Sequence, residues 1–182
     1  MEEKIVFLPN YHRIIDIVCL LAQKSGAPLG VHQAMKLLFF ADVEHMNKHY
    51  VPMTGGRYLA MRFGPVHKEA YDLINGNRLN LLDVDKLPFN RKDKEIVVEE
   101  KRNNYRYMTP EHIAILDNIW TTYGKKDFAE LTDISHQHPA WQKAWGERIN
   151  DAPEMSYEYF LPKALNKEII SDLRESSRFI TL

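Results

Sequence analysis

Residues Lys36–Ile74 read KLLFFADVEHMNKHYVPMTGGRYLAMRFGPVHKEAYDLI, and this stretch decides the fold. Its first part belongs to a segment from about Val31 to Tyr50 that is apolar on nearly every side, which predicts a central, buried helix. The breaker sequence VPMTGG then ends that helix. The following RYLAMRF alternates in character, which predicts a short strand.

The predicted strand has two different faces. Leu59, Met61 and Phe63 alternate with Tyr58 and Arg62, so we expect the first three to pack inward and the other two to face outward. After Gly64, Pro65 suits the first turn of a helix, which we expect over residues 66–75.

Working outward, the apolar stripe from Tyr11 to Lys24 predicts a helix that ends at Gly26. EIVVEE and YRYM, separated by KRNN at 101–104, predict the two strands of a hairpin. Thr109 and Asp127 are N-cap residues for two further helices, and another carries the tryptophans that follow Pro139. The irregular stretch 77–90 should still pack, through Leu79, Leu81, Leu82, Leu87 and Phe89.

The sequence therefore predicts a mainly helical α+β domain, with a buried central helix, surrounding helices and a small antiparallel β-sheet or hairpin. We place this domain at residues 1–149. Residues 150–182 hold an aromatic cluster and an amphipathic helix, and we expect them to form a helical appendage packed on the same domain; the residues concerned are Tyr157, Tyr159, Phe160, Ile169, Ile170 and Leu173.

Composition narrows the class of protein. The 182 residues include 24 basic and 25 acidic side chains, so the formal net charge is −1. A charge this close to zero does not indicate any particular class of binding partner. A hydrophobic fraction of 45% is typical of a soluble globular domain. The single Cys19 cannot form an internal disulfide, and no apolar run is long enough for a bilayer, so we expect a cytoplasmic protein with no membrane contact.

Candidate catalytic and metal-binding patterns are weak. His45 and His49 share a helical face, but the segment lacks the HExxH order and further ligands, so we expect hydrogen-bonded histidines near a helix end. Ser135 and His136 are adjacent without a nucleophile elbow, and the glycines at 55–56 precede a strand rather than a helix. The sequence thus predicts no enzyme, no catalytic residues, no metal and no cofactor.

Nucleic acid is also disfavoured as a partner. Two small groups of basic residues could form a local patch: Arg57, Arg62 and Lys68, and Arg91, Lys92 and Lys94. Phosphate binding relies on a marked excess of lysine and arginine, which this nearly neutral chain lacks.

The opening stretch resembles the core signature of the SocA-like, or Panacea, antitoxin domain. The matching motifs are KLLFFAD, PMTG, YLAMRFGPV and KEAYDLI, and FAELTDISHQHPAWQKAW resembles a later part of the same family, with Ser135 where threonine is commoner. The resemblance covers about Tyr11 to Trp145. The motif residues that we expect to define the fold are Lys36, Leu37, Phe39, Phe40, Asp42, Gly64, Pro65, Val66, Tyr71, His136, Pro139 and Trp141.

This resemblance implies a non-enzymatic bacterial protein, often associated with prophages, that neutralises a toxin encoded next to it through protein–protein interaction. Its partner would be a cognate protein toxin, and Arg57, Tyr58 and Arg62 are the candidate partner-binding residues. Two alternatives stay open: an adaptor that delivers the toxin to a protease, and a DNA-binding prophage regulator. The sequence also leaves an oligomer open.

Overall fold

The computed structural model describes residues 4–77, 86–99, 101–165 and 167–182. It confirms a mainly helical α+β fold with small antiparallel sheets. The helices are α1 (Tyr11–Ser25), α2 (Val31–His49), α3 (Lys68–Ile74), α4 (Pro110–Tyr123), α5 (Phe128–His136), α6 (Pro139–Gly146) and α7 (Lys167–Ser176). The strands are β1 (Leu29–Gly30), β2 (Tyr58–Met61), β3 (Gly64–His67), β4 (Phe89–Lys92) and β5 (Glu95–Val98). Among the described residues, 3₁₀ helices η2 (Tyr157–Phe160) and η3 (Ser177–Phe179) lie before and after α7.

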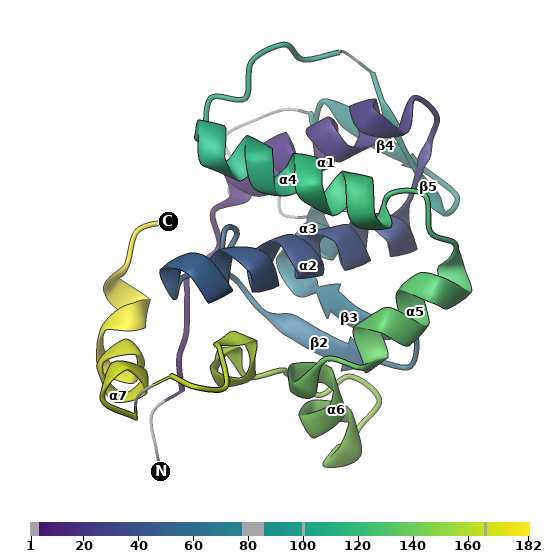
Figure 1. Ribbon diagram of the computed structural model, residues 1–182. Helices are drawn as coiled ribbons and strands as arrows, with labels where there is room; N and C mark the ends of the chain where they lie inside the picture. Colours follow the sequence, from purple (N-terminus) through teal and green to yellow (C-terminus); the bar gives the residue numbers. More distant parts are fainter. Residues whose placement is uncertain (1–3, 78–85, 100, 166) are drawn as a thin grey trace.

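Helix α2 is the centre of the domain. Figure 1 shows it crossing the middle of the molecule, with α4 along one side and the β2–β3 hairpin along the other. Leu37, Leu38 and Phe39 are fully buried, and Phe40 is buried against α4. The prediction of a buried central helix is therefore confirmed.

Local capping explains where several helices begin and end. The Asn10 side chain accepts a hydrogen bond from Arg13 N at the start of α1, and Gly26 ends that helix in the left-handed conformation, at φ 64°. Thr109 and Asp127 cap α4 and α5, as predicted, and each forms a capping box. Among the described residues, no helix combines the length and the apolar character needed to cross a bilayer.

The predicted hairpin of EIVVEE with YRYM is wrong. Strand β5 pairs instead with β4 on one side and β1 on the other, all antiparallel, and the β4–β5 turn contains Asp93 at φ 54°. Residues 105–108 form no strand, because this segment is hydrogen-bonded to a side chain of α1. The Asp16 carboxylate accepts from Arg102 Nη1 at 2.7 Å and from Tyr107 N at 3.0 Å.

The stretch before β4 packs where it is described. Leu87 and Phe89 are buried, as predicted. The corresponding prediction for Leu79, Leu81 and Leu82 concerns positions outside the described residues.

The predicted helix start at Gly64–Pro65–Val66 is also wrong. These residues form β3, which pairs with β2 so that Pro65 lies opposite Ala60. Helix α3 begins only at Lys68, because the His67 side chain accepts from Ala70 N and acts as the N-cap.

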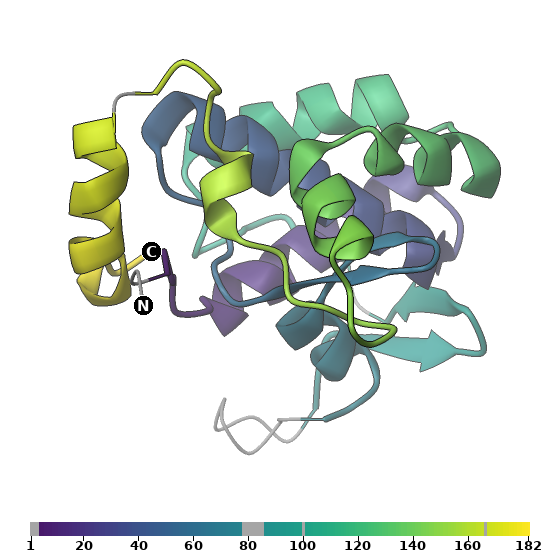
Figure 2. The same ribbon diagram turned by 90° about the horizontal axis from the view of Figure 1, so that it is seen from below.

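The C-terminal part lies against the main domain. Its residues at 153–155 follow the free edge of β2, where Ala60 N donates to Pro153 O and Met155 N donates to Tyr58 O, both at 2.8 Å. Tyr157 and Phe160 are buried in the shared core. Figure 2 shows α7 at the end of the molecule opposite α5, close to the N-terminal segment. A division at residues 149 and 150 stays a prediction.

Candidate functional site

The motif residues of the opening stretch converge on a buried polar network. Asp42 projects from α2 with no exposed surface. Its carboxylate accepts from Thr54 N at 2.9 Å, from the Thr54 hydroxyl, and from the Tyr58 hydroxyl at 2.8 Å. A buried carboxylate needs such donors to offset the loss of water. Asp42 therefore ties α2 to the turn at 53–56 and to β2.

Tyr58 is a partner of this carboxylate and not a surface residue. Its side chain is 1% exposed, so the predicted outward orientation is wrong. Burial, with the neighbouring Asp42 carboxylate, raises the pKa of Tyr58 well above its ordinary value, so the hydroxyl stays a hydrogen-bond donor. Met61 and Phe63, predicted to face inward, are 39% and 50% exposed.

His67 extends the network to α3. Because Ala70 N donates to Nδ1 at 3.1 Å, the ring proton belongs on Nε2, which lies 2.7 Å from Gly55 O and 3.0 Å from the Thr54 hydroxyl. Complete burial lowers the pKa of His67 and keeps the ring neutral. Gly56 has φ 82°, and a Cβ there would lie 2.6 Å from Glu69 Oε2, so the close packing requires glycine.

Glu69 closes the network near the surface. Its carboxylate accepts from Arg57 N at 2.8 Å and from Arg57 Nε at 3.1 Å, and the Arg57 side chain is 49% exposed. The sequence-predicted Arg57 is therefore accessible, but its guanidinium already has a carboxylate partner.

A second buried contact joins α2, β3 and α5. Lys36 is 1% exposed, and its Nζ donates to Pro65 O at 2.9 Å. Burial lowers the pKa of Lys36 to about 7. Gly64 has φ 100°, and a Cβ there would lie 2.4 Å from Ser135 Oγ and 2.7 Å from Lys36 Cε. Glycine at this position allows β3 to approach both helices.

These networks hold the fold together but give no access to a substrate. Asp42, Thr54 and His67 supply an acid, a hydroxyl and a base. The Asp42 carboxylate accepts from Thr54 and Tyr58 and does not orient the His67 ring, whose Nε2 lies against Gly55 O and the Thr54 hydroxyl. A nucleophilic triad requires the acid to orient the base and the hydroxyl to face a substrate. All three residues have no exposed surface, so a substrate cannot reach them in this conformation.

The later motif residues hold α5 and α6 against the hairpin. His136 stacks on Trp141 at a centroid distance of 3.7 Å, and Trp141 Nε1 donates to Met61 O at 3.1 Å. Pro139 opens α6 directly after its N-cap, His138. The stack continues through Trp145, where the guanidinium of Arg148 lies 4.0 Å from the ring centroid.

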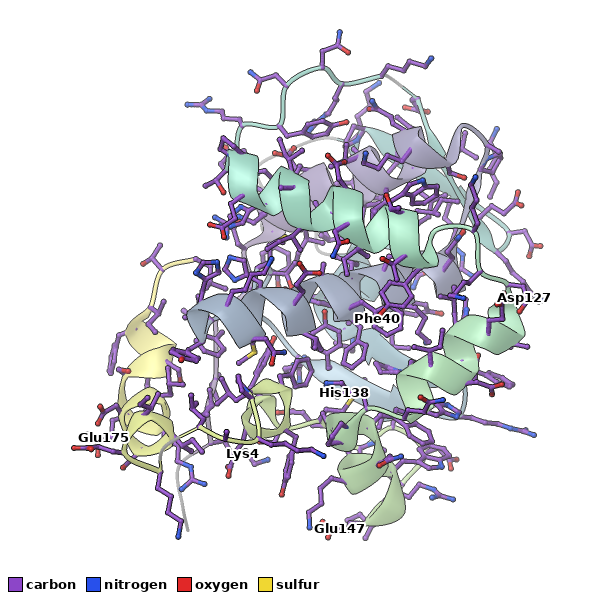
Figure 3. All side chains as sticks on the ribbon, viewed as in Figure 1. Lys4, Phe40, Asp127, His138, Glu147 and Glu175 are labelled. Atoms are coloured by element: carbon purple, nitrogen blue, oxygen red, sulfur yellow. The ribbon has the colours of Figure 1, made fainter. Side chains whose placement is uncertain are left out.

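An open groove of about 480 Å³ lies between α2, α4 and the connection from α5 to α6. Figure 3 shows two of its lining residues, Phe40 on α2 and His138 in the connection between α5 and α6. Burial lowers the pKa of His138 to about 4, so the ring is neutral. The charged residue in the lining is Glu44, which already accepts from Lys48 and Asn118. The groove offers an apolar surface rather than a set of reactive groups.

The remaining candidates have structural partners. His45 Nδ1 lies 2.7 Å from Val51 O, and His49 Nε2 lies 2.9 Å from Glu111 Oε1, which confirms the prediction of hydrogen-bonded histidines. Within the described residues, no group of three or more His, Cys, Asp or Glu is arranged to hold a metal. Tyr71 is 38% exposed and Val66 is half-buried.

Sequence reasoning placed Arg62 on the surface but missed its neighbours. Arg62 lies in the exposed turn between β2 and β3. Phe128, at the first position of α5, packs edge-on against Phe63 with centroids 5.3 Å apart. No local pattern signals this contact, because the residues are 65 positions apart along the chain. The sequence signal that could have indicated it is Phe128 itself, a large apolar residue in the first helical turn after the N-cap Asp127.

The sequence model of the family described as antitoxin SocA-like, Panacea domain, matches residues 35–142. The match covers more than half of the 182 residues and takes in the first segment that carries the sequence resemblance and the second as far as Gln142. It runs from α2 through the hairpin to α6, and so includes the Asp42 network, the Lys36 contact and the Trp141 stack. Searches of curated proteins and of solved structures found no match.

Proposed function

The chain belongs to the antitoxin SocA-like, Panacea domain family, and on this premise we propose that it is the antitoxin of a bacterial toxin–antitoxin pair. It neutralises a protein toxin, encoded by a neighbouring gene, by binding to it directly in the cytoplasm. The observation that carries this proposal is the family match over residues 35–142.

The distribution of side chains supports a binding role. The polar residues of the motif region form hydrogen bonds inside the domain and are not available to a partner, since Asp42, His67 and Lys36 are no more than 1% exposed. Two exposed large side chains of the same region, Met61 and Phe63, lie together at the β2–β3 turn, while the other two, Tyr50 and Tyr71, lie apart from it on α2's C-cap and on α3. Buried polar networks fix a unique structure, while exposed apolar residues in a cluster are typical of a protein-binding surface.

We further propose that the chain has no catalytic activity, cofactor or resident metal of its own. The inaccessible Asp42–Thr54–His67 arrangement supports this. Stoichiometric zinc or iron in the purified protein, detected by elemental analysis and accompanied by turnover, would contradict it.

Two of the sequence-predicted contact residues remain part of the proposal. Arg62 is exposed in the turn, and the Arg57 side chain is half-exposed at the end of the Glu69 network. Tyr58 contributes indirectly, since it holds β2 against α2 through Asp42. We propose no contact between the Tyr58 side chain and the toxin.

Growth rescue tests the function. The neighbouring gene product is expressed from an inducible promoter in a bacterial host, with and without this chain. We expect the wild-type chain to restore growth, and Leu38→Asp, which introduces a carboxylate at a fully buried position of α2, to fail as an unfolded control. A harmless neighbouring product, combined with salt-sensitive binding of the chain to a promoter fragment, would favour the DNA-binding regulator instead.

The same assay separates direct neutralisation from delivery to a protease. Direct binding predicts that rescue persists, with an unchanged amount of toxin, in a host that lacks its cytoplasmic proteases. Rescue that disappears in that host, together with loss of toxin in the parent host, would indicate an adaptor.

A further inference from the structure

The turn between β2 and β3 is rigidly supported although its side chains are exposed. Its main chain is held from two sides, since Trp141 Nε1 donates to Met61 O at 3.1 Å and His32 Nε2 lies 3.2 Å from Phe63 O. Burial lowers the pKa of His32 to about 4, so the ring is neutral and donates through Nε2. The supporting residues come from α6 and α2, so the turn cannot shift without disturbing both helices.

An aromatic surface surrounds this turn. Phe63 and Phe128 are 50% and 51% exposed and lie edge-on to each other at 5.3 Å. The His32 ring lies 4.0 Å from Phe128, and Met61 adds a further exposed apolar side chain. We call Met61, Arg62, Phe63 and Phe128 the hairpin-tip surface. Single exposed apolar residues are ordinary, but a contiguous group on a fixed turn marks an interaction site.

The charge of the hairpin-tip surface comes from Arg62. Its guanidinium lies 5.4 Å from the Phe63 ring centroid, and it makes no ion pair within the described parts of the chain. The carboxylates nearest to Phe128 in sequence are already engaged.

Asp127 caps α5, and Glu130 accepts from Asp127 N and pairs with Lys126. Arg62 places a positive charge beside the exposed Phe63 ring.

We infer that the hairpin-tip surface is the docking site for the toxin, and that it receives an apolar patch of the toxin bordered by a carboxylate. This inference rests on the proposed antitoxin function. Phe63 and Phe128 would enter the apolar patch, and the carboxylate would pair with Arg62. Aromatic and arginine side chains are enriched among the few residues that carry most of the binding energy at protein interfaces, and a turn that is already fixed loses little entropy on binding. A surface with one arginine lacks the clustered charge that nucleic acid requires.

Binding of the purified neighbouring-gene product, measured by titration calorimetry, tests the site with three variants. We expect Phe63→Ala and Phe128→Ala each to weaken binding by about 30-fold or more, the loss expected for an interface hot spot. Arg62→Glu should weaken binding more at low salt than at high salt, because it reverses a charge. A toxin variant with the facing carboxylate changed to lysine should restore the affinity of Arg62→Glu.

A matched control lies at the other end of the molecule. Phe179 is 80% exposed, and Arg178 lies over its ring at 5.8 Å, much as Arg62 lies over Phe63. It belongs to η3, which follows α7 at the end opposite α5 (Figures 1 and 2). Phe179→Ala should bind as the wild type does. Arg106 is exposed in the segment before α4, so Arg106→Glu controls for the change of net charge.

The outcomes separate this inference from the proposed function. If the wild-type chain binds the toxin and all three hairpin-tip variants bind it with the same affinity, the docking site is wrong and the antitoxin function stands. A wild-type chain that binds no toxin would overturn the proposed function, and the docking site with it. Melting curves that match the wild type would show that the variants are folded, because none of the three changes removes a buried side chain.

Discussion

Replacing Tyr58 with phenylalanine removes one hydroxyl from the interior and leaves the ring in place. The ring packs against Phe39 and Phe160, with centroids 5.6 and 5.3 Å away, and these contacts survive the change. The change removes the Tyr58 hydroxyl and with it the 2.8 Å hydrogen bond to the Asp42 carboxylate. Tyr58→Phe therefore isolates the contribution of one donor to the buried carboxylate.

The size of the effect follows from the burial of both partners. A hydrogen bond to a charged group contributes about 1.5–3 kcal/mol, and Asp42 has no exposed surface through which water could replace the donor. Because 1 kcal/mol shifts the melting temperature of a domain of this size by about 2–4 °C, the variant should melt about 3–12 °C below the wild type. The matched control Tyr71→Phe alters a 38% exposed side chain, and its free energy of unfolding should change by no more than about 0.5 kcal/mol.

Thermal unfolding followed by circular dichroism measures both variants. Toxin binding by Tyr58→Phe, at a temperature where the variant is fully folded, should equal that of the wild type, because the side chain does not reach the surface. An unchanged melting temperature would refute the buried hydrogen bond. Weakened binding with normal stability would return Tyr58 to the interface.

Three further changes test the scaffold. Leu38→Asp should abolish the cooperative melting transition in circular dichroism, because an uncompensated buried carboxylate costs several kcal/mol, and a normal curve would show that α2 is exposed. Gly64→Ala should lower the free energy of unfolding in urea by at least about 2 kcal/mol, because its Cβ would meet Ser135 at φ 100°, whereas Gly146→Ala, in open space, should not. Folding lowers the pKa of Lys36 to about 7, so between pH 7 and 9 the unfolded chain keeps a proton on Lys36 that the folded chain has lost. The free energy of unfolding should therefore rise over this range, by up to about 1 kcal/mol per pH unit. Urea unfolding at each pH should show this rise in the wild type but not in Lys36→Met, and an equal rise in both proteins would contradict the buried, neutral lysine.

Sequence reasoning succeeded where structure depends on neighbours in the chain. The bounds of α1, α4 and α5 follow from their cap residues, such as Gly26, Thr109 and Asp127, which act within one turn. The burial of α2 follows from its lack of a polar face. These features are local, so the sequence predicts them without knowledge of the rest of the fold.

It failed where a distant partner decides. Alternation in RYLAMRF correctly separated two faces of β2, but hydrophobicity assigned the wrong one to the core, because Asp42 on α2 supplies a partner for the Tyr58 hydroxyl. In the same way, Asp16 on α1 diverts residues 105–108 from the predicted strand. The meeting of Phe63 with Phe128 depends on how α5 packs on the hairpin, which no local pattern specifies.

The most direct test of the antitoxin function is a binding measurement between two purified proteins, this chain and the product of the neighbouring gene, with no protease and no DNA present. Direct neutralisation predicts a saturable complex that elutes as one species in size-exclusion chromatography and that suppresses the activity of the toxin in vitro. Two proteins that elute separately, with the toxin fully active at saturating concentrations of this chain, would contradict it.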